Sequence, residues 1–281
     1  MRPPGPVASP SVSAERANGA PLSAAAALVR KAIAVAEMDL RKLARDPTEL
    51  ATRAIQPILW LTVFGQVMAR ARMIDTGRTP YIDFLVPGVL AQSVLFIAIF
   101  NGISVIWERD LGIVHKFLAS PTPRAALVLG KALGGGARAL IQALVVLVLG
   151  IVLGVRLNLS PIDLIGAALL VILGAMVFSS FSLSVACIVK TRERFMGVGQ
   201  VLTMPLFFAS NAIYPTSLMP DWLRAVARVN PLTYQIDGLR ACLLPGGSVA
   251  HLGLGVDFSV LAATLIGLVA LCSRLYPAIV R

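Results

Sequence analysis

The stretch LIGAALLVILGAMVFSSFSLSVACIV, residues 164–189, decides the fold class of this chain. It contains no charged residue, and a helix needs only about 20 apolar residues to cross the roughly 30 Å hydrocarbon core of a bilayer. A second stretch, FLVPGVLAQSVLFIAIFNGISVIW at residues 84–107, is equally free of charge. Two such segments predict membrane-spanning helices.

Four further apolar segments extend this pattern along the chain, at residues 54–69, 139–155, 195–213 and 256–275. The segments at 54–69 and 139–155 are short for a span, so we expect them to extend into their flanks. Membrane strands would have to close into a barrel, and the alternation of a barrel strand is missing. The sequence therefore predicts an all-α integral membrane protein with six transmembrane helices.

The composition agrees with a lipid environment. Of the 281 residues, 57% are hydrophobic and 14% are charged, and the mean hydropathy is +0.81, whereas soluble domains carry roughly 25% charged residues. These values exclude an ordinary soluble enzyme, a disordered chain and a disulfide-stapled secreted fold. The net charge of +11 fits basic loops at an anionic membrane face. No stretch combines dense Lys and Arg with interleaved aromatics, so we expect no nucleic-acid partner.

The N-terminal region divides into two parts. Residues 1–22 are rich in Pro, Ala and Ser and predict a disordered tail. Residues 23–46 predict an amphipathic helix, because apolar residues recur at steps of three and four. This helix lies on the cytoplasmic membrane surface or, alternatively, packs in a soluble subdomain. The membrane domain then occupies residues 47–276, and residues 277–281 form a cytoplasmic tail.

The distribution of Lys and Arg predicts the orientation. With the N-terminus inside, eighteen of these residues fall in inner segments and seven in outer loops. Because cytoplasmic loops carry an excess of Lys and Arg, both termini are expected in the cytoplasm. Twenty Arg against five Lys, with abundant Ala, point to a GC-rich bacterial genome and a bacterial cell membrane.

No catalytic, cofactor or metal site is expected in this chain. The middles of the six segments contain no ionisable residue, which also argues against an ion-coupled carrier. Gly130-Lys131 resembles the end of a phosphate-binding loop, but that motif needs Gly at 125 and Ser or Thr at 132, and both positions are Ala. ATP chemistry would have to come from another polypeptide. The cysteines Cys187, Cys242 and Cys272 are expected to be buried hydrophobes.

Two loops carry unusual patterns. Residues 110–118 predict a short helix on the inner membrane face, with acids at its start and apolar residues that suit a groove on a soluble partner; a plain loop is the alternative. Residues 214–255 predict two short amphipathic helices, with Trp222, Val226 and Val229 forming one stripe. These helices are re-entrant at the outer leaflet or, equally, part of a surface loop.

At these loops the sequence resembles the ABC-2 type transporter permeases, and within them the daunorubicin-resistance type of drug exporter. The first motif is Glu108-Arg109-Asp110-Leu111-Gly112, followed by Leu118-Ala119-Ser120-Pro121 and Leu129-Gly130-Lys131. The second is Asn211-Ala212-Ile213-Tyr214-Pro215 with Leu218-Met219-Pro220, then Asn230-Pro231-Leu232-Thr233-Tyr234 and Asp237-Gly238-Leu239-Arg240. Asp110 departs from the family, where Glu is more frequent, but keeps the charge.

The resemblance implies a membrane subunit that pairs with a second permease and with cytoplasmic ATPase subunits, which bind ATP and Mg. It implies that residues 23–46 are a connecting helix and that residues 214–245 are outer re-entrant helices. The implied ATPase-coupling residues are Glu108, Arg109, Asp110, Leu111, Gly112, His115, Lys116 and Phe117. The implied signature residues of the re-entrant region are Asn211, Tyr214, Pro215, Pro220, Asn230, Pro231, Tyr234 and Arg240.

We therefore expect an export permease that moves a hydrophobic small molecule or lipid, using ATP hydrolysed by a separate subunit. A lipid-linked glycan or polysaccharide exporter is the alternative, although only 6% of the chain is aromatic. A membrane scaffold or enzyme is the alternative from another class. The resemblance implies a path lined by the second and fifth spans. Gln92, Asn101 and Asn211 either line that path or make interhelical hydrogen bonds.

Overall fold

A computed structural model describes residues 30, 33, 37, 48–77, 79–114, 123–189, 191–247, 250 and 252–276. Arg30, Ile33 and Glu37 are helical and exposed. The expected tail at 1–22, the rest of the expected helix at 23–46 and the C-terminal tail at 277–281 lie outside the described residues.

The described residues form helices and contain no strand, so the all-α prediction is confirmed. The helices are α2 (Thr48–Leu59), the π-helical turn η1 (Trp60–Gly65), α3 (Gln66–Ala71), α4 (Tyr81–Asp110), α6 (Arg124–Val152), α7 (Pro161–Ile188), α8 (Arg192–Phe208), α9 (Asp221–Val229), α10 (Pro231–Leu243) and α11 (Leu254–Leu275). Short 3-10 turns occur at η2 (Thr216–Leu218) and η3 (Pro245–Gly247).

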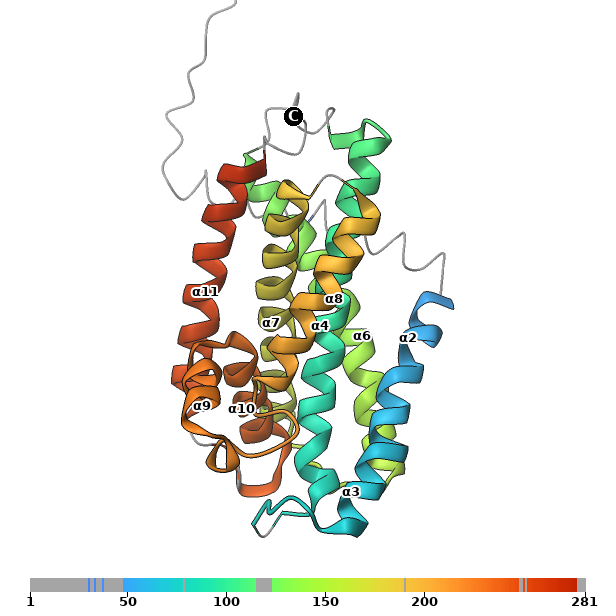
Figure 1. The fold of residues 1–281 in the computed structure, drawn as a ribbon, viewed down its shortest axis with the longest axis vertical. Helices are drawn as coiled ribbons and strands as arrows, with labels where there is room; N and C mark the ends of the chain where they lie inside the picture. Colours follow the sequence, from blue (N-terminus) through green and yellow to red (C-terminus); the bar gives the residue numbers. More distant parts are fainter. Residues whose placement is uncertain are drawn as a thin grey trace, which may run out of the picture.

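Four of the described helices are long and apolar enough to cross a membrane: α4, α6, α7 and α11. The chain is therefore an integral membrane protein. These helices run side by side along the long axis of the molecule, together with α8 and the continuous α2–α3 segment (Figure 1). The short helices α9 and α10 lie together at one end of this bundle.

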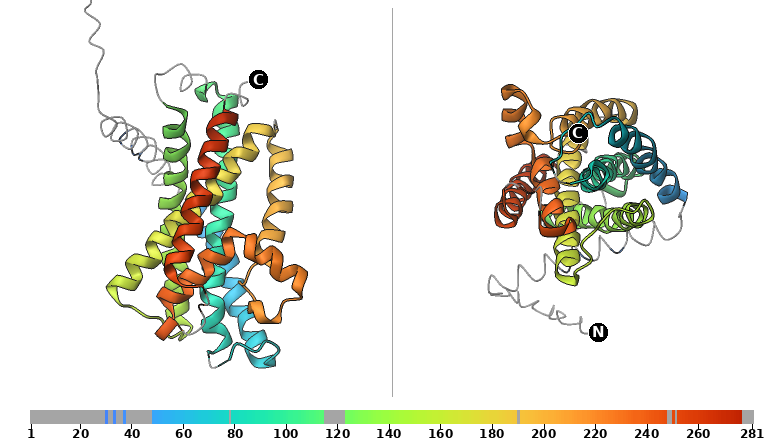
Figure 2. Two further views of the ribbon diagram at one scale, coloured as in Figure 1. Left: turned by 90° about the vertical axis from the view of Figure 1, so that its left-hand side faces the viewer. Right: turned by 90° about the horizontal axis from the view of Figure 1, so that it is seen from below.

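Helix α4 lies at the centre of the bundle and α11 at its edge (Figure 2). In the most apolar window of α4, 78% of the residues are buried, against 11% in α11. Two helices of equal mean hydropathy thus lie in different environments, since α4 packs on α6, α7, α8 and α10, while α11 presents most of its surface outward.

The third apolar segment extends into its N-terminal flank, as its short length predicted. Helix α6 begins at Arg124 and passes through Gly134–Gly136 without a break. The reason is close packing: a Cβ atom on Gly135 would lie 2.5 Å from the Ser179 hydroxyl oxygen. Small residues let membrane helices approach this closely, so packing holds the glycines in helical geometry.

The fifth apolar segment is shorter than predicted. We expected it to span residues 195–213, but α8 begins at Arg192, where the Thr191 hydroxyl accepts a hydrogen bond from the Arg194 N–H, and it ends at Phe208. Residues 209–215 then turn back against α4. A Cβ atom on Gly88 would lie 2.4 Å from the Ala212 carbonyl oxygen, so only glycine permits this approach.

Candidate functional site

Helix α4 ends at the first of the two motifs. The Leu111 N–H donates to the Trp107 carbonyl at 3.0 Å, and the Gly112 N–H donates to the Arg109 carbonyl at 2.9 Å. Gly112 has φ +71°, a left-handed conformation that glycine adopts without steric cost and that commonly ends helices. Gly112 therefore terminates α4, and Val114 after it is buried in a cluster with Val105 and Val128. His115, Lys116 and Phe117 lie outside the described residues.

The Glu108 side chain is buried between α4 and α6. Its side chain faces α6, where the Lys131 ammonium lies 2.6 Å from its carboxylate oxygen Oε1, and the two residues are 5% and 1% exposed. A buried ion pair holds its geometry, because removing either charge leaves the other desolvated. Glu108 therefore ties α4 to α6, and its role in coupling to an ATPase stays a prediction.

The exposed residues of the same motif tie α4 to α8. The Asp110 carboxylate lies 2.7 Å from the Arg192 guanidinium and 2.9 Å from that of Arg109. Arg192 also lies over the Trp107 ring, 3.5 Å from its centroid, in a cation–π arrangement. We call Trp107, Asp110 and Arg192 the α4–α8 clamp.

The sequence left open whether Asn101 lines a transport path or forms hydrogen bonds between helices, and the structure shows hydrogen bonds to α6. Its amide nitrogen donates to the Lys131 carbonyl at 3.1 Å, and its amide oxygen accepts from the Arg138 guanidinium at 3.1 Å. Asn101, a residue of α4, therefore connects this helix to two turns of α6. Gln92 is buried in the middle of α4, and a role for it along a transport path stays a prediction.

The opposite end of the bundle centres on Arg240 in α10. Its guanidinium, 1% exposed, donates to the Asn211 carbonyl at 2.7 Å and lies 3.6 Å from the centroid of the Phe84 ring. Burial lowers the pKa of Arg240 from 12.5 to about 9, and the Asp237 carboxylate opposes that shift, so Arg240 is protonated at neutral pH. It joins α10 to α4 and to the turn after α8.

Asn230 links three elements at this end. Its amide nitrogen donates to the Leu206 and Ala209 carbonyls at 2.7 and 3.0 Å, which satisfies the C-terminal end of α8. Its amide oxygen accepts from the Leu232 N–H at 3.0 Å, which caps the start of α10. One side chain therefore fixes the angle between α8 and α10.

The other signature residues complete the same arrangement. The Tyr234 hydroxyl donates to the Arg228 carbonyl at 2.7 Å, and the Tyr214 hydroxyl donates to the Phe208 carbonyl. Pro220 precedes α9, and Pro231 is the first residue of α10, a position that suits proline because its missing N–H would be unpaired there. The structure thus brings the second motif together as a set of backbone contacts between α8, α9 and α10.

The comparison with known families decides what these two motifs belong to. A family model described as ABC-2 type transporter matches residues 31–244, which include both motifs. The chain belongs to this family.

Several relatives agree with this assignment. The putative transport permease ycf38 of Cyanophora paradoxa is 29% identical over 201 residues, covering 71% of this chain and 69% of the relative. The daunorubicin resistance ABC transporter permease protein DrrB1 of Streptomyces coeruleorubidus is 25% identical over 230 residues, covering 82% and 80%. The inner membrane transport permease YadH of Escherichia coli (strain K12) is also 25% identical over 230 residues, covering 79% and 85%.

The family gives the chain a coarse role. ABC-2 permeases are membrane subunits of transporters that work with an ATP-binding subunit, and they are not themselves the catalytic component. The predicted resemblance is therefore confirmed. Among the described residues of this permease, no group of three or more His, Cys, Asp or Glu side chains could hold a metal ion.

Sequence reasoning missed the partners of the charged residues. Lys131 and Arg192 complete the two contacts at the end of α4, and both stand in segments that we had assigned to inner loops. Arg138 lies in α6, ahead of the apolar segment at 139–155, and Asp257 lies in the first turn of α11, so these two helices carry ionisable residues outside the middles of the predicted segments. Glu108 pairs with Lys131, 23 positions away. This pairing is possible because α6 begins at Arg124 and so includes Lys131, whereas the apolar segment at 139–155 does not.

Proposed function

We propose that this permease is one membrane half of an ATP-driven exporter that moves a hydrophobic small molecule or lipid out of the cell. It works with a second permease, of the same or a related chain, and with a cytoplasmic ATPase that binds ATP and Mg. The name of DrrB1, a relative connected with resistance to a drug, supports a small hydrophobic cargo.

We further propose six spans, with α2–α3 and α8 crossing the membrane beside the four longer helices. Helix α8 has 17 residues, the lower limit for a span. Apolar side chains on the outer faces of both segments are exposed, as expected against lipid or a second permease; they are Ile55, Leu59, Val63, Val67, Met196, Val201 and Phe208.

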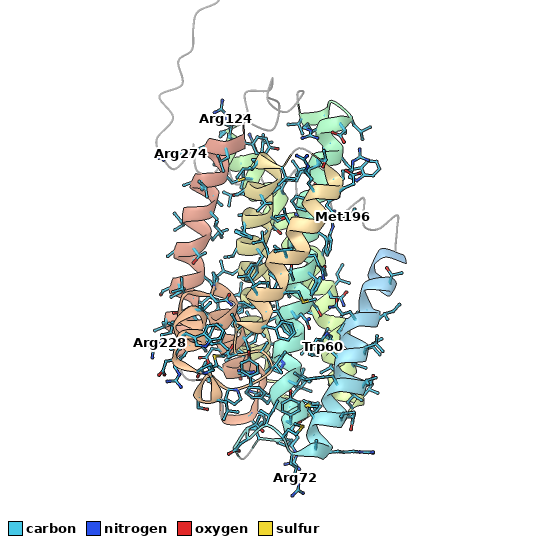
Figure 3. The ribbon with its side chains drawn as sticks, viewed as in Figure 1. Trp60, Arg72, Arg124, Met196, Arg228 and Arg274 are labelled. Carbon is cyan, nitrogen blue, oxygen red and sulfur yellow. The ribbon has the colours of Figure 1, made fainter. Side chains whose placement is uncertain are left out.

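The proposed orientation places the C-terminal end of α4 in the cytoplasm. Arg124 and Arg274 lie at that end and Arg72 at the other (Figure 3). Over the whole sequence, more Lys and Arg residues fall in the segments assigned to the inside than in the outer loops, which supports this orientation. The ends of α9 and α10 would then face outward, where these helices are re-entrant and close the exit of the path. The membrane is that of a bacterial cell, with both termini in the cytoplasm.

The observation that carries the proposal is the way in which the end of α4 is attached to its neighbours. The ATPase would contact the exposed part of the motif around Asp110 and the segment that follows it. A push on this end of α4 is passed to α6 through Glu108 and to α8 through the α4–α8 clamp. The second and fifth spans, α4 and α8, therefore move as one unit, as a transport path between two permeases requires. ATP supplies the work because it binds the two states of the complex with different affinity.

The test is drug uptake into inverted liposomes that contain the permease and its ATP-binding subunit. We expect ATP-dependent accumulation of daunomycinone, the uncharged aglycone of daunorubicin, and Asp110→Arg, which repels Arg192, should lower it by about tenfold. Adding Arg192→Asp reverses the charges of the pair and should restore most of the accumulation.

Asp221→Arg is the matched control, because Asp221 is an exposed acid of α9 that pairs with Arg224 at the other end of the molecule. It should leave accumulation unchanged. Uphill transport by the permease without any ATPase would overturn the proposal, as would equal transport by Asp110→Arg and the unaltered chain.

A further inference from the structure

A cavity of about 380 Å³ lies between the first helix of the described bundle, α2, and the two helices beside it, α4 and α6. Its volume lies in the range of small-molecule sites, roughly 300–1,000 Å³. The side chains that line it come from all three helices and are those of Thr52, Gln56, Ser93, Phe96, Ile97, Phe100 and Gln142.

Gln142 is the polar group that this cavity leaves unexplained. It is 1% exposed, and neither its amide oxygen nor its amide nitrogen forms a hydrogen bond with any residue that the structure describes. A buried amide without a partner costs free energy, and such groups are few in folded proteins. Because Gln142 lines the cavity, a ligand placed there can supply both a donor and an acceptor to it.

An aromatic surface forms another wall. The rings of Phe96 and Phe100 have centroids 6.3 Å apart and planes 20° apart, so they present two similarly oriented faces from consecutive turns of α4. Aromatic rings of a ligand pack well against such faces. Ser93 donates its hydroxyl hydrogen to the Val89 carbonyl at 2.9 Å and keeps its oxygen as an acceptor.

The depth and charge of the cavity restrict the ligand further. Ser93 lies 12 positions after the start of α4, roughly 18 Å along the helix at about 1.5 Å per residue, which places the cavity near mid-membrane. None of the seven lining residues is ionisable. A charged ligand would lose its hydration here without gaining an opposite charge, which is costly in a membrane interior.

We propose that this cavity binds an uncharged ligand that combines aromatic rings with a carbonyl or hydroxyl group, the rings against Phe96 and Phe100 and the polar group on Gln142. The proposal deepens the proposed export function, on which it rests, by giving the chemical class of the cargo and the place within one permease where it binds. Binding does not require ATP, so it is measured on the permease alone, and a failure of transport does not affect the result.

The probe is 4-(hydroxymethyl)benzophenone, which is uncharged, carries two aromatic rings, a ketone and a hydroxyl, and attaches to neighbouring C–H bonds on illumination. The full-length permease in lipid nanodiscs is illuminated with the probe, digested and analysed by mass spectrometry. We expect labelling to concentrate in the cavity-lining parts of α2, α4 and α6. Benzophenone-4-carboxylate, which has the same rings and a negative charge, should compete weakly.

Three variants decide the role of the lining residues. Gln142→Leu keeps a similar volume and removes both hydrogen-bonding atoms, so labelling in the cavity should fall about tenfold. Phe100→Leu should lower it several-fold through the aromatic contact. Gln200→Leu is the matched control, because Gln200 is an exposed glutamine on α8 outside the cavity, and it should change nothing.

Folding is checked with a thiol-reactive fluorophore, since the cysteines that the structure describes, Cys187, Cys242 and Cys272, are free and buried. Labelling that spreads equally over the lipid-facing helices would overturn the proposal. So would labelling in the cavity that both Gln142→Leu and Phe100→Leu leave unchanged in folded protein, because the cavity would then hold only water or lipid.

Discussion

The two ends of the helix bundle hold their charged side chains in different ways. At the C-terminal end of α4, charged groups pair with charged groups: Glu108 with Lys131, and Asp110 with Arg192. At the α10 end, the short contacts of Arg240 and Arg224 go to backbone carbonyls, at 2.7 Å to Asn211 and at 2.9 Å to Met219, while the ion pair of Arg224 with Asp221 is longer, at 3.3 Å.

This difference separates a fixed end from an adjustable one. A backbone carbonyl moves only with its whole segment, so contacts to carbonyls lock α8, α9 and α10 together, and the close approach of Gly88 to Ala212 adds to that lock. A side-chain pair such as Asp110–Arg192 can exchange partners with an approaching protein at little cost, because it is exposed. We therefore expect the α10 end to keep its geometry, and the α4 end to respond to the ATPase.

The largest effect should come from breaking the buried pair at the adjustable end. Lys131→Met removes the Lys131 ammonium from the buried Glu108 carboxylate, and we expect the free energy of unfolding to fall by about 3–5 kcal/mol. The measurement is thermal unfolding in detergent, followed by the reaction of a thiol-reactive fluorophore with the buried cysteines.

The double variant Glu108→Gln with Lys131→Met is the control, because it removes both charges. It should recover most of the lost stability. An equally unstable double variant would show that the position of Lys131 depends on packing of its stem rather than on the ion pair.

A smaller loss is expected at the fixed end. Arg240→Met removes the hydrogen bond to the Asn211 carbonyl and the contact with the Phe84 ring, and should lower the free energy of unfolding by about 2–3 kcal/mol. Arg240→Lys keeps the charge but not the planar group that stacks on the ring, so it should recover only part of the loss. Arg228→Met, on the exposed face of α9, should be neutral in the same melting assay. An Arg240→Lys variant as stable as the unaltered chain would mean that charge alone holds α10.

The sequence predicted the helices of this bundle better than their ends. The apolar segment at 84–107 lies within α4, that at 164–189 ends one residue after α7, and the sixth, at 256–275, agrees with α11, because a long apolar run leaves little choice in a membrane. The beginning of α6 was missed because Lys131, Arg138 and three consecutive glycines interrupt the apolar pattern. Only the packed neighbours Ser179 and Glu108 explain why a helix forms there.

The site was predicted as two motifs but not as contacts. The order of residues around Asp110 and Asn230 was enough to point to the family, since a motif is local. The residues that these motifs contact lie far away in the sequence, in α6 and α8. No periodic pattern in the sequence indicates which distant residues form pairs. Gln142 was missed for a related reason, because one glutamine in an apolar helix cannot be distinguished by sequence from a side chain with a partner.

The smallest effect on stability should come from the exposed pair. Asp110→Asn removes the ion pair with Arg192, but both groups are exposed, and surface pairs contribute little and are screened by salt. The cation–π contact between Arg192 and Trp107 also remains, so the melting temperature should shift by less than about 2 °C. In the same assay the shift should be smaller still at high salt, because the pair of the unaltered chain is then screened. If Asp110→Asn instead destabilised the permease as much as Lys131→Met does, the pair would be a structural element like the contacts at the α10 end, and the two ends would no longer differ in the way that export requires.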